Sequence, residues 1–234
     1  MAFKLRPVRP SGWWCDALLA AAVAALTVAL ARGYLLDLDL AVRDWADAHR
    51  PDPAYAIAVA LNFLGQFGWV LLPVSLLLAG ALVWRTRVAW PLVSIAAAFL
   101  LTGLIVGSMK YWLDRGFPHN TTLAHPEELF SDPVGGTAYP SGHTANAVVW
   151  YGVILLLLRH VLTVYGRPPL RPALGTVIRV APPAIVLCTT TYLGHHWITD
   201  SIAGLLLGLL LARLLTRVPW EDFPLPATSR SRRA

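Results

Sequence analysis

Charged residues are scarce in this chain and make up 14% of its 234 residues. Soluble domains usually carry about 25% charged residues, so the deficit argues against an ordinary soluble protein. Long stretches carry no charge at all, and one of them covers residues 88–109. Because a helix needs about 20 apolar residues to cross the hydrocarbon core of a bilayer, the composition predicts an integral membrane protein with several spans.

Cysteine is nearly absent as well. The two cysteines, Cys15 and Cys188, lie in apolar stretches far apart in the sequence, so we expect neither a disulfide nor a metal-binding pair. No internal repeat is visible, and the only biased segment is the basic end "SRSRRA". The sequence therefore predicts one membrane domain over residues 1–218, followed by a basic cytoplasmic tail over residues 219–234.

The apolar segments predict an all-α bundle of six transmembrane spans. We place them at about 13–35, 68–84, 88–112, 142–160, 174–193 and 197–215. The segment "LDLDLAVRDWADAHRPDP" predicts a short amphipathic helix near the outer surface, and residues 114–140 form a polar outer loop. Basic residues before the first apolar stretch are also typical of a signal peptide, but five further spans favour an uncleaved first span.

The charges divide between the two sides of these spans. Most of the 19 basic residues fall on the side of both termini, whereas most of the 13 acidic residues fall on the other side. Basic residues mark the cytoplasmic face of a membrane protein. We therefore predict a multi-pass protein of the cell membrane with both termini in the cytoplasm. The net charge of +6 is then a topology signal, and we expect no nucleic-acid partner.

Polar side chains gather at the span ends that face outside. They are Lys110, Arg115, His119, His143, His195, His196 and Asp200. Ionisable groups at the rim of a bundle are commonly functional, although a single lysine often only extends its ammonium group to the interface. His196 and Asp200 are four residues apart and share a helical face, where a carboxylate fixes the imidazole tautomer. Outside such a cluster, a pair of this kind is more often a structural hydrogen bond.

The segment "YPSGHTANAVVW" places a polar corner at the start of the fourth span. Ser141 can cap the helix, and Gly142 allows a ligand to approach the backbone closely. The first amides of a helix and its dipole form an anion site, and nearby Lys110 favours phosphate. His143 would then stand beside the phosphate as a general acid, and His196 would attack phosphorus.

At these residues the chain resembles the type 2 phosphatidic acid phosphatase family, which is related to the vanadium haloperoxidases. That family shows Lys-x6-Arg-Pro, then Pro-Ser-Gly-His, then Ser-Arg-x5-His-x3-Asp. The second motif is intact at residues 140–143, the third keeps His196 and Asp200, and the first keeps Lys110 and Pro118. The resemblance covers most of residues 35–215.

The resemblance implies a role for each matching residue. The third-motif His196 would be the nucleophile that forms a phosphohistidine, oriented by Asp200, and His143 would be the general acid. Lys110, Ser141 and Gly142 would hold the phosphate oxygens. No metal or other cofactor is implied.

Both arginines of the family pattern are missing. The first-motif arginine falls on Phe117, and the Ser-Arg pair of the third motif falls on Thr189 and Thr190. Each charged clamp on a transferring phosphoryl group commonly contributes about 3–4 kcal/mol. Three explanations remain open: Arg115, His119 or His195 supplies replacement charge, with Arg115 favoured; the substrate presents its phosphate differently; or catalysis is impaired and the pocket only binds.

We therefore expect a membrane lipid phosphatase that acts on the extracytoplasmic face. Its substrate would be the phosphate or diphosphate of a phosphatidate-like or polyprenyl lipid. The alternatives are a lipid phosphotransferase and a non-catalytic or transport protein that binds an anionic lipid. The sequence leaves the oligomeric state open.

Overall fold

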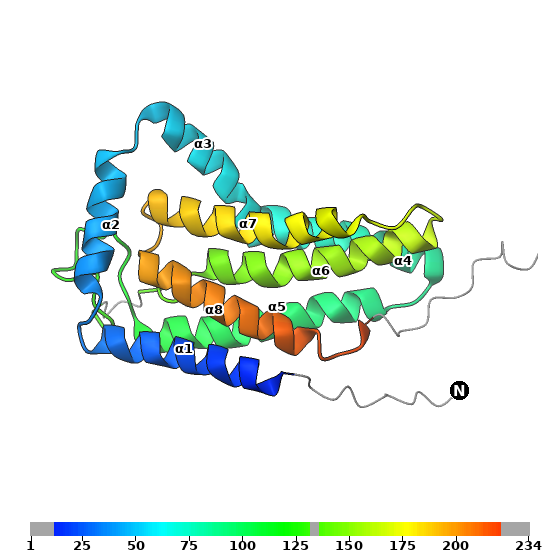
Figure 1. Ribbon diagram of the computed structural model, residues 1–234, viewed down its shortest axis with the longest axis horizontal. Helices are drawn as coiled ribbons and strands as arrows, with labels where there is room; N and C mark the ends of the chain where they lie inside the picture. Colours follow the sequence, from blue (N-terminus) through cyan, green and yellow to red (C-terminus); the bar gives the residue numbers. More distant parts are fainter. Residues whose placement is uncertain (1–11, 132–135, 221–234) are drawn as a thin grey trace, which may run out of the picture.

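The computed structural model describes residues 12–131 and 136–220. In these ranges the chain forms eight α-helices (Figure 1), and Arg115 and Thr137 form an isolated backbone bridge. The helices are α1 (Trp13–Ala31), α2 (Leu36–Ala48), α3 (Asp52–Asn62), α4 (Leu72–Thr86), α5 (Trp90–Leu113), α6 (Gly142–Val164), α7 (Pro172–Tyr192) and α8 (Ile198–Leu215). A 3₁₀ turn (Phe63–Gly65) and a π-helical turn (Phe67–Leu71) connect α3 to α4.

Six of the helical segments in the described ranges are long and apolar enough to cross a membrane, which confirms the predicted fold class. The second of them begins with the π-helical turn and runs over Phe67–Thr86. The first ends at Ala31, four residues before the predicted limit. The chain turns there through two residues with positive φ, Gly33 and Leu35, and then enters α2.

Helix α6 lies at the centre of the bundle. It packs against α4, α5, α7 and α8, and α1 lies along the outer side of α8. The contact between α6 and α8 is close because α8 presents glycines to it. A Cβ atom on Gly204 would lie 2.4 Å from the Ser141 carbonyl oxygen, and one on Gly208 would lie 2.9 Å from Val148. Small residues allow membrane helices to approach in this way.

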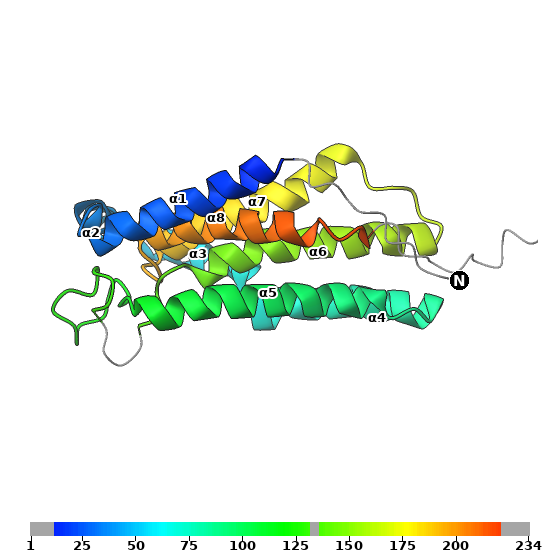
Figure 2. The same cartoon turned by 90° about the horizontal axis from the view of Figure 1, so that it is seen from below.

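The outer elements gather at one end of the bundle. Helix α2 runs across this end, and the loop after α5 and the α7–α8 junction lie beside it (Figures 1 and 2). The α4–α5 and α6–α7 turns lie at the other end (Figure 1). The end of α5, the start of α6 and the start of α8 therefore meet in one layer. We call this end the site end and the other the opposite end.

The predicted cytoplasmic tail falls almost entirely outside the described residues, since the description ends at Trp220.

Candidate active site

The corner before α6 is held in place by backbone bonds. Ser141 is the N-cap of α6 and is fully buried. Its hydroxyl accepts hydrogen bonds from the Thr144 amide (3.4 Å) and the Thr144 hydroxyl (3.2 Å). Its own amide donates to the Asp200 carbonyl oxygen at 2.9 Å. The Ser141 side chain therefore serves as a helix cap, and the corner is fastened to the start of α8.

Two predicted catalytic histidines meet at this corner. The ring centroids of His143 and His196 lie 5.7 Å apart. His143 stands in the first turn of α6, and His196 lies in the α7–α8 junction with 4% of its surface exposed. The structure thus brings together side chains that are far apart in the sequence.

Asp200 lies behind His196. Its Oδ2 atom is 3.5 Å from Nδ1 of His196, and the same oxygen accepts a 3.0 Å hydrogen bond from the Trp197 amide. Asp200 is in the first turn of α8, where a carboxylate is stabilised by the free amides and the helix dipole. The start of α8 therefore fixes the carboxylate that faces the imidazole.

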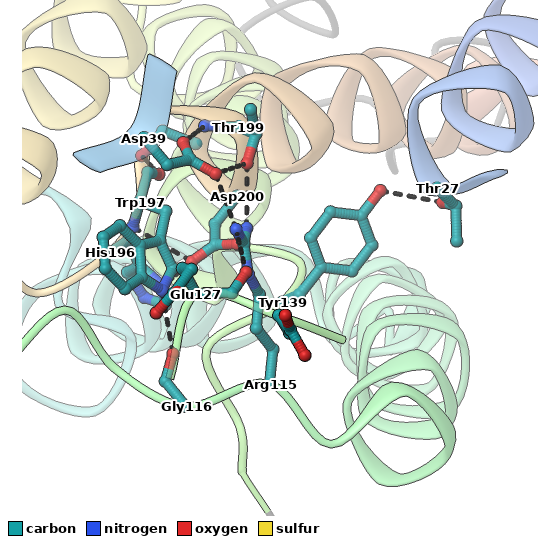
Figure 3. A network of polar contacts seen from close by, with 12 residues as sticks. Thr27, Asp39, Arg115, Gly116, Glu127, Tyr139, His196, Trp197, Thr199 and Asp200 are labelled. Carbon is teal, nitrogen blue, oxygen red and sulfur yellow. Dashed lines mark hydrogen bonds and ion pairs between the residues drawn. The ribbon is translucent and has the colours of Figure 1, made fainter. Parts of the chain in front are cut away.

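Arg115 occupies the other side of Asp200 (Figure 3). Its guanidinium is fully buried and donates to Asp200 Oδ1 (2.5 Å), Asp39 Oδ2 (2.6 Å), the Thr199 hydroxyl (2.8 Å) and the Glu127 carbonyl oxygen. The N–H groups of the guanidinium thus all have acceptors within the protein. The structure places Arg115 behind Asp200, and not among the histidines where the sequence-based hypothesis of a replacement phosphate clamp put it.

Asp39 and Thr199 belong to this network and were not singled out from the sequence. The Asp39 carboxylate accepts from the Thr199 amide (3.0 Å) and the Thr199 hydroxyl (2.6 Å), and it is buried. Asp39 lies on α2, in a segment predicted to rest on the surface. The sequence offers one indication of this role. If the helix covers a polar end of the bundle, one of the two acids in "LDLDL" has to point toward the bundle.

Lys110 approaches the corner from α5. Its Nζ atom donates to the Thr137 carbonyl oxygen, and its Cε atom is 3.5 Å from the position that a Cβ on Gly142 would take. Lys110, Gly142 and Asn146 line a cavity of about 210 Å³ between α5 and α6, whose other walls include Phe67 and Phe99. The Lys110 side chain thus passes close to Gly142, the first residue of α6.

A second cavity, of about 600 Å³, opens on the other side of His143. It is lined by Phe117, His119, Asn120, His143, Leu193, Gly194, His195 and His196. We call it the histidine cavity. His195 is exposed here, and its ring centroid is 6.3 Å from that of His143. The two cavities flank the Gly142–His143 step, so a phosphate at this step can be reached from both.

The positions of the missing arginines are occupied in different ways. The Phe117 ring is 41% exposed, lines the histidine cavity and has its centroid 5.8 Å from that of His196. Thr190 is fully buried, and its hydroxyl has no hydrogen-bond partner in the described part of the chain. Neither side chain supplies a charge.

Two carboxamides before α4 face the histidines instead. The Gln66 amide nitrogen lies 3.2 Å from Nε2 of His143, and the Asn62 amide nitrogen lies 3.4 Å from Nδ1 of His195. The Asn62 oxygen accepts from the Thr189 hydroxyl at 3.2 Å. Both residues lie just before the second span, Asn62 at the end of α3 and Gln66 between the two short helical turns, and neither was among the candidate residues from the sequence. They add neutral hydrogen-bonding groups to the site.

The two adjacent histidines of the α7–α8 junction are tuned toward the neutral form. Burial lowers the pKa of His196 below its ordinary value, and the Asp200 carboxylate opposes this effect. Burial also lowers the pKa of His195, with the neighbouring His196 and Arg50 adding to the effect. A neutral imidazole has a free lone pair and can act as a nucleophile or base at neutral pH.

His119, which sequence analysis offered as a source of charge, lies 3.0 Å from Asp47 on α2. Asp47 is also paired with Arg50 at 2.7 Å. In the described ranges, no three His, Cys, Asp or Glu side chains converge closely enough to hold a metal ion.

These features define a class: a multi-pass helical membrane protein that brings two imidazoles, a carboxylate and a lysine to one end of its bundle. Comparison with known proteins identifies the family. The model of the PAP2 superfamily matches residues 91–224, and the chain belongs to this superfamily of membrane lipid phosphatases.

A curated protein and a solved structure, both from Bacillus subtilis, are similar to this chain. Phosphatidylglycerophosphatase B (strain 168) is 32% identical over 156 residues, which are 66% of this chain and 70% of that protein. The crystal structure of a transmembrane PAP2 type phosphatidylglycerolphosphate phosphatase superposes with a TM-score of 0.70 at 23% identity. The match covers 89% of this chain and 98% of that one, and it supports the six-span fold.

Proposed function

We propose that this phosphatase hydrolyses the terminal phosphate of a membrane lipid through a phosphohistidine on His196. The observation that carries the proposal is the meeting of His143, His196 and Asp200, with Lys110 beside Gly142, at one end of the bundle. No other arrangement in the described residues combines a buried neutral imidazole with a carboxylate and an anion-binding helix start.

The phosphate would bind at the start of α6. The first amides of this helix have no intrahelical partners, and the helix dipole favours negative charge there. The Lys110 side chain passes close to Gly142, the first residue of this helix. In the absence of the two arginines, Lys110 and the helix start would balance the phosphate charge, and the carboxamides of Gln66 and Asn62 would help to orient its oxygens.

The reaction would proceed in two steps. In the first, Nε2 of His196 attacks phosphorus, a P–N bond forms and the bond between phosphorus and the lipid oxygen breaks. His143 gives its proton to the departing oxygen, and Asp200 stabilises the charge on the imidazole through Nδ1. In the second, water attacks phosphorus, His143 accepts its proton, and inorganic phosphate and free His196 are released.

The lipid would reach the site from the bilayer. The cavity beside Lys110 lies between two spans and has walls such as Phe67, Phe99 and Val106, so it can hold the first carbons of a chain. The name of the Bacillus subtilis relative indicates phosphatidylglycerophosphate as the first substrate to test. Polyprenyl phosphates and diphosphates remain in the substrate class because the missing arginines alter the phosphate contacts.

The same proposal includes the sidedness of the site. Basic residues predominate at the opposite end of the bundle, and this supports a cytoplasmic position for that end and an extracytoplasmic one for the catalytic groups. Labelling of single cysteines introduced near Asn120 and near Arg167 in intact cells tests this orientation. Reaction of only the first with an impermeant reagent is expected.

The proposal is tested with purified protein and a panel of phosphatidylglycerophosphate, phosphatidate and polyprenyl phosphates. We expect phosphate release from at least one lipid, and its loss in His196→Ala and in His143→Ala. A phosphorylated intermediate trapped by rapid denaturation should map to the peptide that contains His196. Release that survives both substitutions would contradict the mechanism, and transfer of phosphate to an added alcohol would indicate a phosphotransferase.

A further inference from the structure

A third cavity, of about 410 Å³, lies at the opposite end of the bundle, away from the catalytic groups. Its walls come from α6, α7, α8 and the segment that follows α8, and they include Val149, Gly152, Leu156, Arg159, Arg179 and Trp220. We call it the arginine cavity. The proposed reaction makes no use of it.

The two arginines of this cavity stand inside predicted spans. Arg159 is five residues before the end of α6, and Arg179 is seven residues after the start of α7. At 1.5 Å per residue, they lie about 8 and 10 Å inward from the helix ends. Both side chains are exposed, and arginines near a helix end extend their guanidinium groups to the interface, where an anionic headgroup can bind them.

The side chains of Arg159 and Arg179 lie on the same face of α7. A terminal nitrogen of Arg159 lies 3.3 Å from the position of a Cβ on Gly175. Gly175 and Arg179 are four residues apart, so they share one helical face. Arg159 therefore reaches across from α6 to the face of α7 that carries Arg179, and the two charges border one cavity.

Neither arginine has a counter-ion in the described residues, and no carboxylate lines the arginine cavity. Two other arginines near the same end differ in this respect. Arg213 and Arg217 both pair with Asp16, and the Arg213–Asp16 distance is 2.5 Å. Within residues 12–131 and 136–220, one pair of cations is thus neutralised by Asp16, whereas the other pair borders a hollow without a carboxylate.

Most of the other residues that line the cavity are apolar, with Thr216 as an exception. Val149, Gly152 and Leu156 follow one face of α6 above Arg159. From Val149 to Arg159 the helix rises about 15 Å, so the apolar wall extends well into the hydrocarbon layer. Such an apolar wall suits an acyl chain whose headgroup contacts the two arginines.

From this combination we infer that the arginine cavity binds an anionic phospholipid of the leaflet at the opposite end. Its phosphate contacts Arg159 and Arg179, and one acyl chain lies against α6 between α7 and α8. Basic pockets between membrane helices are known to hold anionic headgroups. The lipid is a ligand that stabilises this end of the bundle, distinct from the substrate.

Three variants test the inference, and each is expected to fold. Arg159→Gln with Arg179→Gln removes both charges. Gly152→Leu fills the hollow, since a Cβ on Gly152 meets no atom within 4 Å. Arg85→Gln with Arg87→Gln is the control, because it removes the same charge from the same end of the bundle, at the end of α4 and outside the cavity.

The probes are dioleoyl phosphatidylserine and dioleoyl phosphatidylcholine, neither of which carries a terminal phosphate. Native mass spectrometry of delipidated protein counts bound lipid, and a thermal melt in detergent measures the stabilisation. We expect the wild-type protein to retain phosphatidylserine in preference to phosphatidylcholine. The double arginine variant should bind it about thirtyfold more weakly, at roughly 1 kcal/mol for each basic residue.

Gly152→Leu should also weaken retention, although it leaves every charge in place, and the Arg85 and Arg87 control should retain phosphatidylserine as the wild type does. Equal loss in the control would show a diffuse effect of surface charge and would overturn the inference. So would equal binding of phosphatidylcholine, displacement of the lipid by inorganic phosphate, or unchanged binding in the double arginine variant.

Discussion

The backbone amide of Ser141 donates a 2.9 Å hydrogen bond to the carbonyl oxygen of Asp200. This single bond joins the corner that carries His143 to the turn that carries the carboxylate behind His196. The two proposed catalytic histidines therefore keep their relative positions only while α6 and α8 remain in register. The glycines on α8 that face α6 maintain this register, which leads to the first prediction.

Gly204→Ala should impair catalysis by moving the corner before α6. The added Cβ would lie 2.4 Å from the Ser141 carbonyl oxygen and 3.2 Å from its Cβ, so one helix has to shift. Overpacking of this kind costs about 1–3 kcal/mol of stability. A displacement near 1 Å at a catalytic group can lower the rate about a hundredfold. The measurement is kcat for lipid phosphate, together with a thermal melt.

Gly80→Ala on α4 is the matched control. A Cβ there meets nothing within 4 Å, and replacement of a helical glycine by alanine gains up to about 1 kcal/mol. Full activity of Gly204→Ala, equal to that of the control, would show that the register between α6 and α8 does not govern the site.

Arg115→Leu should destabilise the protein strongly. The substitution leaves Asp39 and Asp200 buried without their shared partner, and the loss of one member of a buried ion pair costs about 3–5 kcal/mol. Asp44→Asn breaks the exposed pair with Arg43, where the Asp44 side chain is 66% exposed, and should change stability by at most about 1 kcal/mol. Thermal melts of both variants decide the comparison, and similar melting temperatures would refute the structural role of Arg115.

The sequence was sufficient for the spans but not for this network. Charge-free stretches and the positions of Lys110, His143 and His196 at span ends predicted which helices meet, because a membrane allows few arrangements. The partners of Arg115 could not be predicted in this way. Asp39 and Thr199 are 160 residues apart, and their contact depends on how α2 crosses the site end, for which local periodicity contains no information.

The same limit explains why Gln66 and Asn62 were missed. The segment around them reads as a helix interruption, and only its three-dimensional path, through a 3₁₀ and a π-helical turn, aims the two amides at His143 and His195. The catalytic roles of the histidines themselves remain predictions. The structure shows that the rings of His143 and His196 lie close together.

The activity should depend on pH through His196. Burial places the pKa of its imidazole below the ordinary value of about 6.5, so the nucleophile is neutral at pH 7. On the acid side, we expect kcat/KM to fall as pH drops below 6.5, when His196 becomes protonated. Asp200→Asn removes the carboxylate that raises this pKa, so the acid limb should move to lower pH while the rate falls. A shift to higher pH would contradict the assigned electrostatics.

The stability of the folded protein should also depend on the protonation of His196. Because the folded pKa of His196 lies below the unfolded one, the unfolded chain binds more protons between the two values. The contribution of His196 is therefore complete above pH 6.5 and is lost as pH falls toward the folded pKa. The slope is at most about 1.4 kcal/mol per pH unit for one proton. Melting temperatures from pH 5 to 8 should show a shallower acid-side decline in His196→Ala than in the wild type.

Phe117→Arg should strengthen phosphate binding at the histidine cavity. The Phe117 side chain is 41% exposed, borders the cavity and has its ring 5.8 Å from that of His196, so a guanidinium can enter without being buried. A positioned charge on a transferring phosphoryl group contributes up to about 3–4 kcal/mol, and a flexible exposed one will supply part of this. We expect kcat/KM for a lipid phosphate monoester to rise about tenfold and substrate preference to move toward monoesters.

Phe117→Leu separates charge from shape, since it also removes the aromatic ring but adds no cation. Thr190→Arg is a harsher comparison, because Thr190 is fully buried and an arginine there needs a bound phosphate to compensate it. If Phe117→Arg and Phe117→Leu gave the same kinetics for every lipid in the panel, the phosphate would not lie within reach of Phe117. The binding position at the start of α6 would then have to be moved toward the Lys110 cavity.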